Sequence, residues 1–247
     1  MKQNKKRIRI VLLICVVAVG LFLMIAGYLG SYYPAGKKAM VAMAGNEEVE
    51  VSKENPYYEF HSLKQESSSE KEGIIFYPGA KVDEKAYAPL MMKLAEAGYE
   101  VFLVKMPFHM AIFDINAADD IIADHDNITT WVLSGHSLGG AMAANYVAAN
   151  PSQVDGLLLL AAYETKDISK SDITVVSIYG TKDKVLNQKN YQKYLDNLPT
   201  DYVEDVIIGG NHAGYADYGK QKGDGIATIS KEEQEDAVLQ EVKKIKF

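Results

Sequence analysis

The stretch Val132-Leu133-Ser134-Gly135-His136-Ser137-Leu138-Gly139-Gly140 decides the fold of this chain. Strand-forming residues lead into it, and an alanine-rich helical pattern follows it. A turn this tight from strand to helix leaves no space for side chains two residues before and two residues after the serine, which explains Gly135 and Gly139. The pattern predicts a nucleophile elbow that presents Ser137 at the carboxyl end of a strand and the amino end of a helix, where the helix dipole favours negative charge.

Apolar runs alternate with helical patterns along the rest of the chain. The expected strands cover 47–51, 57–61, 73–77, 99–104, 128–133, 154–162, 173–179 and 203–208. The expected helices cover 83–97, 112–123, 138–150 and 187–197, with a final helix from Ser230, where Glu233 completes a capping box. A polar hairpin or loop is expected at 64–72. Strands that alternate with helices and are apolar on both faces predict an α/β domain with a doubly wound, mainly parallel sheet.

Charge is distributed unevenly over the 247 residues, a length that suits one large domain plus an appendage. Residues 1–38 hold seven basic residues and no acidic one, so the rest of the chain carries a formal charge of −14 within a total of −7. A domain this acidic repels nucleic acid. The one cysteine, Cys15, lies in an apolar segment, which excludes an intrachain disulfide and argues against a thiolate metal site. We expect no metal and no organic cofactor.

The chain begins with a basic and then an apolar segment. Five basic residues within 1–9 precede Ile10–Leu29, a run of 20 residues without a charge. As a helix this run would be about 30 Å long, which is the thickness of the hydrocarbon core of a bilayer. The apolar regions of signal peptides run only about 7 to 15 residues. The length therefore favours a retained transmembrane helix, although Ala42-Met43-Ala44 offers a site for cleavage.

These features divide the chain into four parts: a basic cytoplasmic head (1–9), a transmembrane anchor (10–30), a spacer (31–46) and a folded domain (47–247). Because basic flanks stay on the cytoplasmic side, we expect a single-pass protein whose domain lies outside the cytoplasm. The alternative is a domain that is secreted after cleavage. The membrane is therefore one expected partner, and no protein partner is evident.

A serine hydroxyl becomes a strong nucleophile when a base takes its proton and an acid orients that base. In the elbow architecture these groups follow in the order serine, acid, histidine. His212 is the only histidine after Ser137, and it follows an expected strand directly. Asp183 lies in the loop after the strand at 173–179 and is the favoured acid, with Glu164 as the alternative. The predicted catalytic residues are therefore the serine, this aspartate and the histidine.

The oxyanion that forms during acyl transfer needs two backbone N–H donors. Leu138, directly after the serine, supplies one of them in this architecture. We expect the other in the loop after the first parallel strand, Pro78-Gly79-Ala80-Lys81, with Ala80 preferred and Lys81 as the alternative. The side chain of His136 is expected to point away from the reacting atoms and to pack or form a hydrogen bond.

Three motifs resemble the α/β-hydrolase superfamily: Gly-His-Ser-Leu-Gly-Gly at 135–140, Gly-Thr-Lys-Asp at 180–183 and Gly-Asn-His at 210–212. The resemblance covers roughly 47–247 and implies the α/β-hydrolase fold and its triad. More narrowly, the segments at 77–83 and 210–219 are similar to a little-characterised bacterial group whose members are often membrane-anchored and labelled dienelactone-hydrolase-like. Dienelactone hydrolases proper use a cysteine nucleophile, whereas this chain has a serine, so their chemistry is not carried over.

No large lid is expected. About ten residues separate the strand ending at Ala162 from the strand beginning at Ile173, where many lipases insert helices. The site should be open, or covered by the glycine- and tyrosine-rich segment 213–228, because long segments of this kind are often functional. The possible pocket residues are Lys81, Tyr215 and Tyr218.

The sequence thus predicts a serine hydrolase that cleaves a carboxylic ester, a thioester or a small amide through an acyl-enzyme on Ser137. Its expected partner is a small-molecule acyl substrate, and the acidic domain disfavours anionic substrates. Two alternatives remain. One is a catalytically silent binding or scaffold protein with the same fold, and the other is an acyltransferase that favours another acceptor over water.

Overall fold

The computed structural model describes residues 2–63 and 71–244, with side chains from residue 12 onward. The chain divides into two units, Met1–Tyr32 and Tyr33–Phe247. The first unit consists mainly of helix α1, Lys2–Gly30. Its segment Leu12–Gly30 is long and apolar enough to cross a membrane, a property that signal sequences share. The structure therefore contains the predicted apolar helix as a candidate transmembrane segment.

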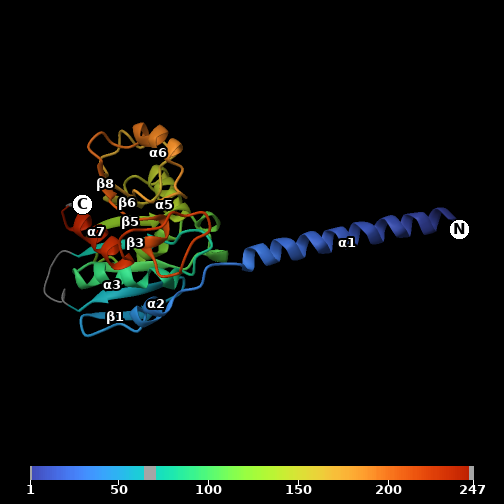
Figure 1. Cartoon of the computed structure of the whole chain (residues 1–247), viewed down its shortest axis with the longest axis horizontal. Helices are drawn as coiled ribbons and strands as arrows, with labels where there is room; N and C mark the ends of the chain where they lie inside the picture. Colours follow the sequence, from blue (N-terminus) through green and yellow to red (C-terminus); the bar gives the residue numbers. More distant parts are fainter. Residues whose placement is uncertain (1, 64–70, 245–247) are drawn as a thin grey trace. The chain divides into compact units, whose positions relative to one another are not determined.

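The second unit is built on a sheet whose described strands lie in the order β1-β2-β4-β3-β5-β6-β7-β8 (Figure 1). The strands are β1 (Val49–Lys53), β2 (Tyr57–Ser62), β3 (Glu72–Tyr77), β4 (Glu100–Val104), β5 (Thr130–His136), β6 (Gly156–Leu160), β7 (Thr174–Gly180) and β8 (Val203–Ile207). Neighbouring strands from β4 to β8 are parallel, and β2 is antiparallel to both β1 and β4. The mainly parallel sheet confirms the predicted fold class.

Helices cover both faces of this sheet. They are α2 (Lys37–Ala42), α3 (Ala88–Glu96), α4 (Ala118–Asp124), α5 (Leu138–Ala149), α6 (Gln188–Tyr194) and α7 (Lys231–Lys244). Short 3₁₀ turns are η1 (Glu84–Tyr87), η2 (Pro107–His109), η3 (Ala111–Phe113), η4 (Leu195–Asn197) and η5 (His212–Tyr215). The helices α3 and α7 share one core with the sheet, and α4 and α5 share the other. The sheet is therefore doubly wound.

Alternation along the strands explains the two cores. In β3, Ile74 and Phe76 pack into the core beneath α3, whereas Ile75 and Tyr77 pack into the core beneath α5. A strand covered on both faces needs apolar residues at consecutive positions, which is the pattern that the sequence displays.

Two of the expected helices begin differently from the prediction. The helix expected over 83–97 starts as η1 and becomes regular at Ala88, and the helix expected over 112–123 is regular only in α4. The Tyr77 hydroxyl donates to the Ile115 carbonyl at 2.8 Å and accepts the Ala118 N–H at 2.9 Å. This buried tyrosine fixes the chain ahead of α4. Most of the loop expected at 64–72 lies outside the described residues, and Glu72 already belongs to β3.

The sequence predicts a spacer at 31–46. In the structure, residues 33–46 belong instead to the compact unit. The Tyr33 N–H donates to the Lys81 carbonyl at 2.7 Å, and the Tyr33 carbonyl accepts the Asp83 N–H at 2.9 Å. The Gly36 N–H donates to the Asp217 carbonyl at 2.6 Å, and Ala39 of α2 is fully buried. These backbone groups find partners on the domain, so the segment packs against it.

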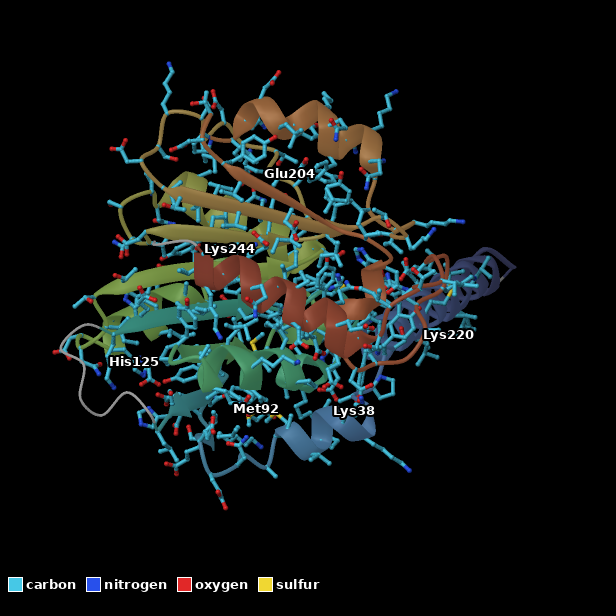
Figure 2. All side chains as sticks on the ribbon, turned by 60° about the vertical axis from the view of Figure 1, so that its left-hand side comes forward. Lys38, Met92, His125, Glu204, Lys220 and Lys244 are labelled. Carbon is cyan, nitrogen blue, oxygen red and sulfur yellow. The ribbon has the colours of Figure 1, made fainter. Side chains whose placement is uncertain are left out.

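Because β3 to β8 run parallel, the loops that follow them meet at one edge of the sheet, which we call the carboxyl edge. The elbow follows β5, the predicted oxyanion loop follows β3, and Asp183 and His212 follow β7 and β8. Figure 2 shows Lys38 and Lys220 toward this end of the strands and His125, which precedes β5, toward the other. The fold thus collects the predicted site residues at one place.

Candidate active site

The elbow has the backbone geometry that its sequence predicts. Ser137 has φ 54° and ψ −122°, a left-handed conformation that costs a residue with a side chain about 1–3 kcal/mol. Its N–H donates to the Leu160 carbonyl at 2.9 Å. A Cβ atom on Gly135 would lie 2.6 Å from the carbonyl carbon of Gly139, and one on Gly139 would overlap the Tyr77 carbonyl. The two glycines therefore let β3, β5 and α5 approach closely enough to hold the serine in this conformation.

His212 and Asp183 form a buried pair. The Nδ1 atom of His212 lies 2.8 Å from Oδ2 of Asp183. The other carboxylate oxygen of Asp183 accepts the N–H groups of Val185 and Leu186, both at 2.8 Å. Since a carboxylate accepts only, it fixes the tautomer that carries the proton on Nδ1. Within the described residues, Nε2 of His212 is buried and has no hydrogen-bond partner, so it is available to take a proton.

Glu164, the alternative acid, is engaged elsewhere. Its Oε1 atom accepts the N–H of Lys166, and its backbone carbonyl accepts the side-chain amide of Asn197 at 3.1 Å. Burial raises the pKa of Glu164 to about 7, against an ordinary value of 4.5. The hydrogen-bond pattern selects Asp183 as the group that orients His212.

Ser137 and His212 line the same cavity, which has a volume of about 350 Å³. Its walls are mostly apolar, with a few polar groups. The lining residues besides this pair are Leu138, Ala141, Met142, Asn145, Ala161, Ala162, Tyr163, Thr165, Val185, Leu186 and Asn187. An apolar cavity with few polar groups is typical of a small-molecule site.

Within the described residues, the two backbone N–H groups expected to bind an oxyanion have no hydrogen-bond acceptor in the protein. These are the N–H groups of Ala80 and Leu138. The N–H of Lys81, the alternative donor, is bonded to the His109 carbonyl at 2.7 Å. The geometry thus favours Ala80 over Lys81 for this role.

His136 points away from the cavity, as expected. Its Nδ1 atom lies 2.8 Å from the Tyr87 hydroxyl, which in turn accepts the Gly79 N–H at 3.0 Å. Its ring packs against the rings of His212 and Tyr215, with centroids 4.4 and 5.2 Å apart. Burial, and then the neighbouring His212, hold the pKa of His136 well below its usual range, so this ring is neutral. A hydrogen-bonded chain therefore joins the elbow to the oxyanion loop.

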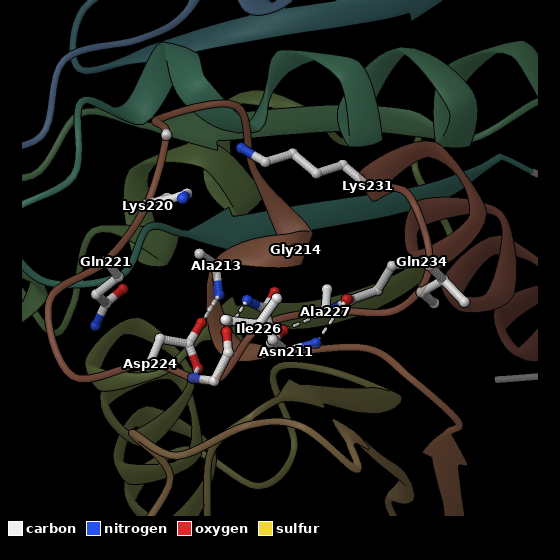
Figure 3. Close-up of a pocket in the computed structure, with 13 residues that line it drawn as sticks. Asn211, Ala213, Gly214, Lys220, Gln221, Asp224, Ile226, Ala227, Lys231 and Gln234 are labelled. Atoms are coloured by element: carbon white, nitrogen blue, oxygen red, sulfur yellow. Dashed lines mark hydrogen bonds between the residues drawn. The ribbon is translucent and has the colours of Figure 1, made fainter.

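A second cavity of about 280 Å³ lies behind the histidine, between the segment after it and α7 (Figure 3). In its wall, the Asp224 carboxylate accepts the N–H groups of Ala213 at 2.9 Å and of His212 and Lys184 at 3.3 Å each. Gln234 is fully buried and exchanges two hydrogen bonds with the backbone of Asn211. These contacts hold the histidine loop against the loop that carries Asp183.

The pocket residues expected from the sequence lie elsewhere. Tyr215 is fully buried against His136, and Tyr218 packs its ring on Tyr33 at 5.5 Å. Lys81 has φ 62° and pairs its backbone with Tyr33 and His109. None of the three lines the cavity at Ser137. The segment 213–228 is not its cover, because the two tyrosine rings find apolar surface in the core.

Some site residues were not anticipated. Met142 lies one helical turn after Leu138, and Val185 and Leu186 directly follow Asp183, so helical spacing and chain adjacency could have indicated them. Tyr87 and Asp224 reach the site over long separations in sequence, and no local pattern marks them.

One cluster of metal-ligating residue types lies on β2 and β4, where Glu59, His61 and Glu100 bring ligand atoms within 4.8 Å of one another. Both oxygens of Glu100 already have partners, because His61 Nδ1 lies 2.9 Å from one and Lys71 Nζ lies 3.1 Å from the other. The Glu100 carboxylate is therefore engaged by other side chains of the protein.

Comparison with known proteins identifies relatives of this chain. The model of the Alpha/beta hydrolase family matches residues 73–236. A protein of Mycobacterium phage D29, named as a non-heme haloperoxidase, is 28% identical over 98 residues, which are 36% of this chain. This chain matches about a third (35%) of that relative's length.

Solved structures resemble the whole domain at low sequence identity. Est1E from Butyrivibrio proteoclasticus has a TM-score of 0.58 and 13% identity, covering 80% of this chain and 98% of its own. Carboxyl esterase 2 from Tuber melanosporum has a TM-score of 0.59 and 12% identity, with coverages of 85% and 91%. A CIB-like hydrolase from Thermoplasma acidophilum has a TM-score of 0.56 and 16% identity, with coverages of 80% and 98%. The matched family model spans well over half of the chain, which therefore belongs to the Alpha/beta hydrolase family.

Proposed function

We propose that the protein is a serine hydrolase that cleaves a carboxylic ester through an acyl-enzyme on Ser137. One observation carries the proposal: a serine in a left-handed conformation shares an apolar cavity with a histidine whose far nitrogen is bonded to a buried carboxylate. The esterases among the structural neighbours are consistent with it.

The proposed reaction has two halves. In the first half, Nε2 of His212 takes the proton of the Ser137 hydroxyl as Oγ attacks the carbonyl carbon, and the N–H groups of Ala80 and Leu138 stabilise the oxyanion. Collapse breaks the ester bond, and His212 gives its proton to the departing alcohol. In the second half, water loses a proton to His212 and attacks the acyl-enzyme. The bond between the acyl carbon and Oγ then breaks, His212 returns the proton to Oγ, and the acid is released. Asp183 keeps the ring in the required tautomer throughout.

Replacing the nucleophile tests this proposal. We expect Ser137→Ala to lower kcat for p-nitrophenyl butyrate by at least about 10³-fold, because the acyl-enzyme cannot form. Ser152→Ala, on an exposed loop, is the matched control and should retain full activity. A fluorophosphonate probe should label the wild type at Ser137 only.

Three other results would each replace the proposal. Folded protein that takes no label would indicate the silent binding or scaffold alternative. Labelled protein that transfers the acyl group to an added alcohol far faster than to water would indicate the acyltransferase. Ester hydrolysis that survives Ser137→Ala would place the chemistry on another residue.

The location is part of the proposal. We propose that Leu12–Gly30 is a retained single-pass anchor, that the domain lies outside the cytoplasm, and that the chain belongs to the membrane-anchored group that its motifs resemble. Digestion of intact cells with an added protease should then degrade the domain, whereas a cytoplasmic control protein should survive. Recovery of the domain in the medium, without α1, would support secretion after cleavage instead.

A further inference from the structure

We infer that the carboxyl edge of the sheet lies against the surface of the membrane that holds α1, and that Ser137 acts on acyl esters held in that membrane. This inference rests on the proposed function and on α1 being a retained anchor.

Residues 31–32, which we call the tether, connect α1 to the compact unit, and they form a very short segment. The helix α1 ends at Gly30 and the compact unit begins at Tyr33. Three residue steps span at most about 11 Å even when fully extended. Whatever the direction of α1, the chain therefore holds Tyr33 within about that distance of the end of the apolar helix.

The tether joins the domain beside the predicted oxyanion loop. Tyr33 forms a parallel bridge with Val82, and its N–H donates to the Lys81 carbonyl. On its other side, the Tyr33 ring packs on Tyr218, and its hydroxyl accepts the Lys222 N–H at 3.3 Å. The junction thus lies between the loop after β3 and the segment after His212, both at the carboxyl edge. A membrane that holds α1 would therefore lie close to this edge.

An apolar patch occupies the same edge. Phe108, Ile112 and Phe113, in the loop after β4, are each about half exposed, at 54%, 51% and 51%. The two phenylalanine rings pack edge to face with centroids 5.5 Å apart. The His109 carbonyl in this loop accepts the Lys81 N–H, which ties the patch to the oxyanion loop. Exposed apolar and aromatic side chains that gather beside a membrane tether suit the bilayer interface.

The basic side chains at this edge also suit the surface of a membrane that contains anionic lipids. Lys37, Lys38, Lys220 and Lys222 are exposed on the segments that flank the junction. Lys38 and Lys220 lie toward the same end of the strands in Figure 2. The sequence after residue 38 carries −14, so anionic lipids would attract this edge and repel most of the remaining surface. Aromatic and basic side chains together select the carboxyl edge as the face toward the bilayer.

This arrangement defines the substrate class. An ester whose remaining part stays in the bilayer needs to place only its acyl group and carbonyl in the cavity of about 350 Å³ at Ser137. We therefore expect two butyryl esters to behave differently: p-nitrophenyl butyrate in water, and a dipalmitoyl-butyryl glycerol embedded in vesicles of phosphatidylglycerol and phosphatidylcholine.

The first test lengthens the tether. The full chain, reconstituted in these vesicles, would carry a 30-residue Gly/Ser insertion between Ser31 and Tyr32, which leaves the contacts of Tyr33 intact. We expect butyrate release from the embedded ester to fall about tenfold or more, because local concentration falls steeply with linker length. Hydrolysis of the soluble ester should stay within twofold. Equal effects on both esters would overturn the inference, and absence of soluble-ester hydrolysis in the wild type would instead refute the proposed function.

The second test probes the patch without relying on catalysis. The indole introduced by Phe113→Trp should be quenched by brominated lipids in the reconstituted protein, whereas the buried native Trp131 should not. The double change Ile112→Ser with Phe113→Ser should lower release from the embedded ester about fivefold or more. Leu63→Ser, an exposed apolar residue at the opposite edge, is the matched control and should have no effect. An unquenched indole, or equal effects of patch and control variants, would contradict the membrane-facing edge.

Discussion

Single hydrogen bonds decide how well the proposed oxyanion site is formed. Tyr87 is fully buried and links the Gly79 N–H to the His136 ring. The hydroxyl accepts one hydrogen bond and has one proton to donate, so both neighbours are satisfied by the same oxygen. Removing that oxygen leaves a buried N–H and a buried ring nitrogen without partners, next to the Ala80 N–H that we expect to hold the oxyanion.

We therefore predict that Tyr87→Phe lowers kcat for p-nitrophenyl butyrate about tenfold while KM changes less than twofold. The reason is that one unsatisfied buried group costs about 1–3 kcal/mol and here falls on the loop that positions Ala80. Steady-state kinetics would measure the change. Tyr146→Phe, which also removes a buried hydroxyl, here bonded to Asp119, is the control. Equal losses in kcat for both variants would mean that Tyr87 acts only through general stability.

A second prediction concerns Glu164 and the dependence of stability on pH. Its pKa is raised by burial to about 7 in the folded state, against an ordinary value of 4.5. The folded protein thus binds this proton more tightly than the unfolded chain, so stability falls as pH rises from about 4.5 to 7, by up to about 3 kcal/mol. Glu164→Gln should match the wild type at pH 4.5 and be more stable by about 1–3 kcal/mol at pH 8.

Urea denaturation at the two pH values would measure that difference. Glu47→Gln removes an exposed carboxylate ahead of β1 and should leave the free energy of unfolding unchanged at both. A Glu164→Gln variant that is less stable than the wild type at pH 8 would contradict this prediction, because it would show that the ionised carboxylate stabilises the folded protein.

At the scale of elements, the site depends on how two loops are held together. Asp224 accepts N–H groups from the histidine loop and from Lys184, directly after the acid. The carboxylate thus fixes the loop after β7 against the loop after β8. It lines the second cavity and not the cavity at Ser137, so we expect it to position His212 without touching the reacting atoms.

We predict that Asp224→Ala lowers kcat/KM about 100-fold, because the partly buried N–H groups of His212 and Ala213 lose their acceptor and the distance between Asp183 and His212 is no longer fixed. Asp224→Asn keeps one acceptor oxygen and should recover part of the loss. Asp201→Ala, on an exposed turn before β8, is the control, and an equal loss there would refute the positioning role.

Motifs that lie within a single element or turn could be predicted from the sequence. The elbow was predictable because the steric requirement for its two glycines arises within five consecutive residues. The capping box of α7 is equally local, and it is confirmed by the hydrogen bonds between Ser230 and Glu233 at 2.7 and 3.1 Å. Local chemistry of this kind can be read without knowing the rest of the fold.

Contacts between distant segments were not predictable in this way. Tyr87 meets His136 across 49 positions, and Asp224 holds a histidine 12 positions away through backbone contacts that any acceptor could make. The sequence indicates Tyr215 as a pocket residue, whereas the structure buries it, because a tyrosine suits both a pocket wall and a core. Only the tertiary packing of its ring against His136 decides between the two.

At the scale of the whole molecule, the segment 33–43 is a structural part of the domain. It contributes a bridge to Val82, hydrogen bonds to Asp217 and the buried side chain of Ala39. We predict that a chain starting at Asn46 unfolds about 6–12 °C below one starting at Ser31. The lost contacts contribute about 3 kcal/mol, and each kcal/mol shifts Tm by about 2–4 °C in a domain of this size.

Calorimetry of the two shortened chains would test this. Equal melting temperatures would mean that residues 31–45 only rest on the domain without stabilising it. Comparison with the full chain in detergent would show whether α1 itself adds stability.

The packing of this segment also determines what a protease cut within it would do to the domain. A cut at Ala42-Met43-Ala44, the small-residue site that would shed the domain, lies inside the packed segment, since Ala42 and Met43 pack against the core. A protease would have to open that packing before it could cut, and the fragment released would lack a piece of its own fold. A cut that releases the domain would therefore also destabilise it. If α1 is a retained anchor, as proposed, a released domain should be short-lived and activity should stay with the membrane fraction.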